Sequence, residues 1–80
     1  MNFEEALQKI ISLAGEQFPD AKVVIDEATG PQDIPSWNSL KHVMFIASIE
    51  KAFGIKFDLL QMIDQKSIGD IARATHETLK

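Results

Sequence analysis

Residues 35–54 read PSWNSLKHVMFIASIEKAFG, and this stretch predicts one helix over residues 37–53. Pro35 biases Ser36 away from the helical region, which makes Ser36 the expected N-cap. Gly54 follows the last predicted turn, where glycine commonly ends a helix because it adopts the left-handed conformation without strain. The stretch therefore defines both ends of a long central helix.

Ser39 stands in the first turn of this helix. The first N–H groups of a helix lack intrahelical acceptors, and together with the helix dipole they stabilise a phosphate at that end. Ser39 is therefore a candidate modification site. The alternative is an ordinary first-turn serine whose hydroxyl satisfies backbone groups.

The apolar residues of the central helix form two stripes rather than one. Ile46, Ile49 and Phe53, which Phe45 can join, form the first stripe, and Leu40, Val43, Met44 and Ala47 form the second. One stripe is enough to pack a helix into a small bundle, so the second predicts a docking face for a partner protein. The alternative is that the second stripe packs under the long loop that precedes the helix.

The rest of the chain predicts an all-α fold: a four-helix bundle with three main helices, one short helix and a long first loop. An amphipathic helix is expected over residues 3–18, with Asn2 as its cap and Glu5 at the capping-box position. A short helix is expected over residues 58–64. The last helix is expected to begin at Ser67, again with an acid three residues later.

The connection over residues 19–36 is expected to be a loop, although Val23-Val24-Ile25 has the composition of a short strand. No second strand is available to pair with it, and an unpaired strand leaves backbone groups unsatisfied. Val24, Ile25 or Ile34 is expected to anchor this loop to the core. Connections of this length usually carry function or disorder.

The composition describes one domain over residues 1–80. The chain is 45% hydrophobic and has no cysteine, which fits a single small domain in a reducing compartment. The net charge of −4 argues against nucleic-acid binding. No apolar run approaches the roughly 20 residues that span a bilayer. We therefore expect a cytoplasmic monomer without membrane insertion.

Three short motifs carry a resemblance to a known family. Asn38-Ser39-Leu40 opens the central helix, Phe53-Gly54-Ile55 closes it, and Ser67-Ile68-Gly69-Asp70-Ile71 opens the last helix. In these motifs, their spacing and the order of helices, the chain resembles the acyl carrier protein family over nearly its whole length. The resemblance implies the acyl-carrier-like four-helix bundle.

The resemblance also implies a function. A magnesium-dependent phosphopantetheinyl transferase would transfer 4′-phosphopantetheine from coenzyme A to Ser39. The terminal thiol of this arm would hold an acyl or aminoacyl group as a thioester. A loading ligase would supply the group, and acyl-transferring enzymes docked on the central helix would receive it. The carrier itself would not be an enzyme.

The chain departs from the family pattern at two places. Asn38 replaces the commonest aspartate, which is thought to help recognition by the transferase. The central helix bears Lys41, His42 and Lys51 with Glu50 as its only acid, where fatty-acid carriers usually bear several acids. Docking is therefore expected to be more apolar and less salt-sensitive than that of fatty-acid carriers, with Lys41 and His42 on the docking face. This difference predicts a specialised pathway rather than general fatty acid biosynthesis.

Trp37 is similar to a tryptophan found in a subset of free-standing carriers that serve specialised acyl or aminoacyl transfer. The resemblance places Trp37 and Asn38 beside the attached arm. The alternative for Trp37 is a hydrophobic cover over the long loop.

His42 lies three residues after Ser39, so the two share a helix face, as a nucleophile and its base would. The sequence has no G-x-S-x-G motif, and the chain is small for an enclosed active site, so hydrolase activity is not predicted. His42 and His76 lack metal-ligand spacing. His42 is interpreted as a polar residue that contacts a partner or the phosphate.

The leading alternative function is a carrier-like helical domain that is never modified and acts only as a protein-interaction module. Asn38 is the residue that keeps this alternative open.

Overall fold

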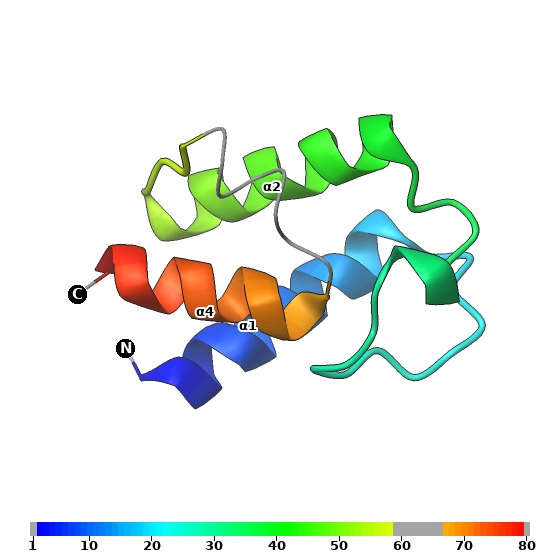
Figure 1. The fold of residues 1–80 in the computed structure, drawn as a ribbon, viewed down its shortest axis with the longest axis horizontal. Helices are drawn as coiled ribbons and strands as arrows, with labels where there is room; N and C mark the ends of the chain where they lie inside the picture. The colour runs from blue at the N-terminus through cyan, green and yellow to red at the C-terminus, as the bar shows by residue number, and fades with distance from the viewer. Residues whose placement is uncertain (1, 59–66, 80) are drawn as a thin grey trace.

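The structure is a computed structural model that describes residues 2–58 and 67–79 (Figure 1). Its elements are α1 (Phe3–Gln17), a 3₁₀ turn η1 (Pro31–Asp33), α2 (Ser39–Phe53) and α4 (Ile68–Leu79). The described residues form no strand, in agreement with the predicted all-α class. The short helix predicted over residues 58–64 lies almost entirely outside the described residues.

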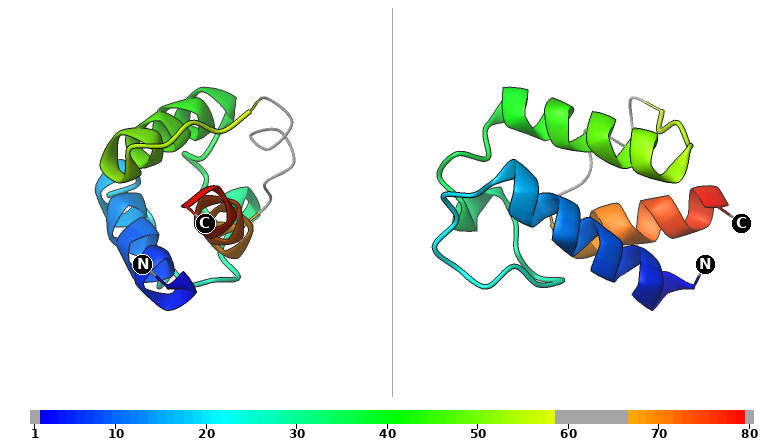
Figure 2. Two further views of the ribbon diagram at one scale, coloured as in Figure 1. Left: turned by 90° about the vertical axis from the view of Figure 1, so that its left-hand side faces the viewer. Right: turned by 180° about the vertical axis from the view of Figure 1, so that it is seen from behind.

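The three long helices pack around one core. α1 contacts both α4 and α2, and Figure 2 shows the three helices surrounding a common centre. Both ends of the chain lie at one end of the bundle, and α2 begins at the opposite end (Figure 1). The bundle therefore presents the start of α2 away from the chain ends.

The first helix follows from its cap and its apolar periodicity. The Asn2 side chain accepts from the Glu5 N–H at 2.8 Å, and the Glu5 carboxylate accepts from the Asn2 N–H at 3.2 Å. This reciprocal pair is the predicted capping box. Residues 3–17 are helical, and Phe18 closes α1 with a hydrogen bond from its N–H to the Ala14 carbonyl at 2.9 Å.

The first apolar stripe of α2 lies in the core, as predicted. Phe45, Ile46 and Ile49 are fully buried, and Phe53 packs against them half-buried. The other core residues come from α1, α4 and the connections: Leu7, Ile10, Ala14, Phe18, Ile34, Trp37, Phe57, Ile68, Ile71 and Ala72. The second stripe is left on the outside of the bundle.

The connection between α1 and α2 is a loop, as predicted, and Ile34 is its buried anchor. Ile25 is half-buried, whereas Val24 is 88% exposed and anchors nothing. A short 3₁₀ turn, residues 31–33, was not predicted. At the start of this turn the Gly30 N–H donates a hydrogen bond to the Asp33 carboxylate at 3.0 Å.

The same loop is tied to the start of α4. The Ile68 N–H donates to the Thr29 carbonyl and the Gly69 N–H to the Glu27 carbonyl, each at 2.8 Å. These bonds satisfy two N–H groups that a helix start leaves without intrahelical acceptors. At Gly69 the two backbones approach so closely that an added Cβ would lie 2.6 Å from the Glu27 side chain. The long loop is therefore held in place by α4.

The last helix agrees with its predicted start. The Ser67 hydroxyl accepts from the Asp70 N–H at 3.1 Å, which makes Ser67 the cap. The buried face carries Ile68, Ile71, Ala72 and Thr75. Leu79 is exposed and lies in the last turn of the helix.

The predicted start of α2 was wrong by two residues. Its N-cap is Asn38, whose side chain accepts from the Lys41 N–H at 2.9 Å, and its first helical residue is Ser39. Ser36 does not cap the helix because its hydroxyl donates to the Asp20 carboxylate at 2.9 Å. Trp37 belongs to a turn, in which its N–H donates to the Ile34 carbonyl at 3.0 Å. The C-terminal prediction is confirmed, since Gly54 is left-handed with φ 67°.

Candidate functional site

Ser39 is the first helical residue of α2, and its side chain is exposed. The preceding residue, Asn38, has an extended backbone, with φ −98° and ψ −175°, and turns the chain into the helix. The helix start lies at the end of the bundle that is remote from the chain ends (Figure 1). Ser39 is therefore reachable from solvent at a helix terminus.

The backbone around Ser39 favours an anion. Asn38 accepts hydrogen bonds from two N–H groups of the first turn. Its side-chain oxygen accepts from the Lys41 N–H at 2.9 Å, and its backbone carbonyl accepts from the His42 N–H at 2.9 Å. The Ser39 and Leu40 N–H groups donate to no acceptor among the described residues. Free N–H groups and the positive end of the helix dipole together stabilise a phosphate. The residues present therefore fit a phosphate ester on the Ser39 oxygen.

Trp37 lies in the core rather than on the surface. Its side chain is only 5% exposed, and its ring stacks on Phe18 with 4.9 Å between centroids. It also meets Phe45 edge to face at 5.6 Å. This burial favours the interpretation of Trp37 as a hydrophobic cover, because little of the ring is accessible to an attached arm.

His42 is half-buried and is held by Trp37. The indole Nε1–H of Trp37 donates to Nδ1 of His42 at 3.1 Å, and the two rings stack at 21°. An Nδ1 that accepts a hydrogen bond is unprotonated, so the proton of a neutral His42 lies on Nε2. A general base is usually oriented by an acceptor such as a carboxylate, and here a donor occupies Nδ1. This arrangement is not that of a nucleophile–base pair.

The second apolar stripe of α2 faces solvent. Leu40 is 69% exposed, Val43 52% and Met44 46%, and Ala47 is also exposed. Lys41 is half-buried beside them. These side chains do not pack under the long loop, so the alternative interpretation of this stripe was wrong.

Two comparisons with known proteins agree with this geometry. The family described as "phosphopantetheine attachment site" matches residues 37–75. The solution structure of the holo acyl carrier protein from Geobacter metallireducens is similar to this chain with a TM-score of 0.81 and 31% sequence identity. The similarity covers 92% of this chain and 85% of that one. This chain belongs to the acyl carrier protein family. No curated protein sequence matches it significantly.

The family establishes what kind of protein this is. Acyl carrier proteins bear covalently attached 4′-phosphopantetheine and are carriers rather than enzymes, so this chain is a carrier. Such carriers work with a phosphopantetheinyl transferase and with partner enzymes. Within residues 2–58 and 67–79 no helix is long and apolar enough to cross a membrane. The same residues form no group of metal-binding side chains.

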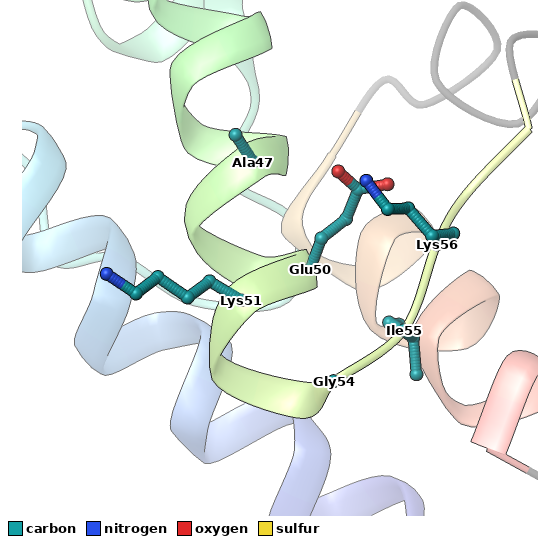
Figure 3. Close-up of a pocket in the computed structure, with 6 residues that line it drawn as sticks. All are labelled: Ala47, Glu50, Lys51, Gly54, Ile55 and Lys56. Carbon is teal, nitrogen blue, oxygen red and sulfur yellow. The ribbon is translucent and has the colours of Figure 1, made fainter.

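A pocket lies at the far end of α2 from Ser39. Its volume is about 450 Å³, and Figure 3 shows its lining: Ala47, Glu50, Lys51, Gly54, Ile55 and Lys56. The Glu50 carboxylate accepts from the Phe57 N–H at 2.8 Å and so holds the chain that leaves the helix. The exposed stripe of this acyl carrier protein therefore runs along α2 into a pocket bordered by two lysines.

The sequence did not predict the Trp37–His42 bond or the pocket. The bond joins a turn residue to the first turn of α2, a spacing of five residues that matches neither helix nor strand periodicity. The pocket depends on where the chain turns after Gly54. The only sequence signal for the Trp37–His42 hydrogen bond was the presence of these two residues on either side of Ser39.

Proposed function

We propose that the Ser39 hydroxyl is the attachment point of 4′-phosphopantetheine and that this chain carries an acyl or aminoacyl group as a thioester on that arm. A phosphopantetheinyl transferase would catalyse attack of the Ser39 oxygen on the coenzyme A phosphate that bears the pantetheine arm, and the pyrophosphate P–O bond would break to release adenosine 3′,5′-bisphosphate. The hydroxyl proton would pass to a base of the transferase. When bound, the arm supplies the thiol that this cysteine-free chain lacks.

The single observation that carries the proposal is the unengaged Ser39 hydroxyl beside free helix amides. The family match over residues 37–75 contains two other serines. The Ser48 hydroxyl donates to the Met44 carbonyl at 3.2 Å, and the Ser67 hydroxyl caps α4. Ser39 is exposed and makes no hydrogen bond through its hydroxyl to a described residue. These differences support Ser39, rather than Ser48 or Ser67, as the modified serine.

Asn38 supports the same site despite replacing an aspartate. Its side-chain oxygen caps the helix at 2.9 Å, and asparagine and aspartate are about equally good caps. The geometry of the helix start therefore does not require a carboxylate. What Asn38 lacks is the negative charge, so we expect it to affect recognition by the transferase and not the position of Ser39.

The exposed stripe of α2 supports docking of partner enzymes beside Ser39. We propose that a loading ligase and acyl-transferring enzymes bind this face, in a dedicated pathway rather than general fatty acid synthesis. The support is the scarcity of acids on α2, where Glu50 is the only one and is turned to the Phe57 N–H. A cytoplasmic monomer remains our prediction.

Incubation with coenzyme A, magnesium and a broad-specificity phosphopantetheinyl transferase, followed by intact-mass measurement, tests the attachment site. We expect a gain of one phosphopantetheine, lost in Ser39→Ala and retained in the matched control Ser48→Ala. An unmodified interaction module would gain no mass in any variant. Retention of the gain in Ser39→Ala would place the arm on another residue.

A further inference from the structure

The exposed face of α2 is apolar along its centre and positively charged at its border, and this pattern selects a kind of partner. We propose that it docks an enzyme whose contact surface is apolar and edged by carboxylates, one of which binds beside Lys51 at the edge of the pocket. This inference rests on the proposed role of Ser39, because that role brings the partner to α2.

The geometry of the face is a straight stripe. Leu40, Met44, Ala47 and Lys51 are spaced by four, three and four residues, which places them in line on one side of a helix. All four are exposed. At 1.5 Å per residue the stripe runs about 16 Å from the turn that holds Ser39 to the pocket. A docked partner can therefore contact both ends at once.

The charges along this face are unbalanced. In the described residues the ion pairs within 4 Å involve only Arg73, so Lys41, Lys51 and Lys56 pair with no described carboxylate. Glu50, the only acid on α2, is half-buried and accepts from the Phe57 N–H. Figure 3 shows Lys51 and Glu50 leaving α2 in opposite directions, with Lys56 on the side of Glu50.

The positive charge at the border of this face favours a partner whose contact surface is negatively charged. A surface edged by arginines or lysines would be repelled by three ammonium groups that pair with no described carboxylate, whereas carboxylates would be attracted and would orient the encounter. The apolar centre supplies the buried contact, as exposed apolar patches commonly do at binding sites. At the end of the stripe Lys51, which points away from Glu50, provides the place for one carboxylate (Figure 3).

The test uses two forms of one broad-specificity phosphopantetheinyl transferase. One form carries glutamates and the other arginines at the border of its carrier-binding surface. The value of kcat/KM is measured for modification of the full chain at about 50 mM and about 300 mM NaCl, concentrations that change the screening length. We expect the glutamate form to be roughly fivefold faster at low salt and the difference to shrink at high salt.

Matched variants locate the effect. We expect Lys51→Glu/Lys56→Glu to reverse the preference and Lys51→Gln/Lys56→Gln to abolish it. The same charge reversal at Lys22, an exposed lysine on the α1–α2 connection, is expected to change nothing. Circular dichroism confirms that each variant is folded.

Three results would overturn the inference. Equal rates with the two transferases, or a faster arginine form, would show that the lysines do not select the partner, with the attachment site intact. An equal effect of Lys22→Glu would show that only net charge matters. Failure of both transferases to add any mass would overturn the proposed carrier site itself, and this inference with it.

Discussion

The indole Nε1–H of Trp37 donates to Nδ1 of His42 at 3.1 Å and so ties the turn before α2 to the first turn of the helix. Asn38 and Ser39 lie between these two residues. The ring of Trp37 is in turn clamped by Phe18 and Phe45 in the core. The start of α2 is thus anchored to the bundle on one side while the Ser39 side chain stays exposed on the other.

Loss of the Trp37–His42 bond is expected to destabilise the fold. In a double-mutant cycle with Trp37→Phe and His42→Ala, we expect a coupling energy of about 0.5–1.5 kcal/mol, the usual net contribution of one hydrogen bond. Urea unfolding followed by circular dichroism measures it, because Trp37 is the only tryptophan and fluorescence is lost with it. A coupling energy of zero would show that the two residues act independently.

Removal of the Asn38 cap is expected to cost stability, whereas restoring the family aspartate is not. Asn38→Ala should lower the free energy of unfolding by about 1 kcal/mol because the Lys41 N–H loses its acceptor. Asn38→Asp should retain or slightly raise stability, since a carboxylate favours a helix N-terminus. Ser36→Ala is the control for a serine that does not cap α2. Equal losses in Asn38→Ala and Ser36→Ala would contradict this cap assignment.

The two stripes of α2 are expected to respond differently to substitution. Ile49→Ala truncates a fully buried side chain and should cost about 2–5 kcal/mol of unfolding free energy. Met44→Glu on the exposed stripe should leave the melting temperature nearly unchanged but slow modification by the transferase. Thermal unfolding and kcat/KM are compared for both variants. A large drop in melting temperature for Met44→Glu would place Met44 in the core.

The close approach of Gly69 to Glu27 is expected to forbid a side chain there. A Cβ at Gly69 would lie 2.6 Å from the Glu27 Cγ and 3.0 Å from its carbonyl oxygen, so Gly69→Ala should cost about 1–3 kcal/mol. Gly15→Ala is the matched control, because nothing lies within 4 Å of its added Cβ.

Gly15→Ala should stabilise α1 by about 0.5–1 kcal/mol through lower backbone entropy in the unfolded chain. Urea unfolding compares the two variants. Adding Glu27→Ala to Gly69→Ala should recover only part of the loss, since the backbone contact remains. Equal effects of Gly69→Ala and Gly15→Ala would mean that the loop does not press on α4.

The helices and the candidate site were predictable where the signal is local. The capping box of Asn2 and Glu5, the cap at Ser67 and the stop at Gly54 each involve residues within one turn of one another. Local sequence therefore contains all the atoms that decide them. The start of α2 was misplaced because two polar residues, Ser36 and Asn38, both suit a cap. Ser36 is excluded as the N-cap only by its hydrogen bond to Asp20, which lies sixteen residues away in the sequence.

Periodicity was sufficient to separate two apolar stripes on α2 and to place Ser39 in its first turn, because helical geometry alone assigns residues to faces. It contained no information on what each face meets. Packing into the common core buried Ile46 and Ile49 and left Leu40 and Met44 in solvent, and ring contacts with Phe18 and Phe45 hold Trp37 in that core. Three features depend on the tertiary structure, because no helical or strand periodicity relates the residues that form them. They are the Trp37–His42 hydrogen bond, the hydrogen bond from the Gly69 N–H to the Glu27 carbonyl, and the pocket beside Lys51.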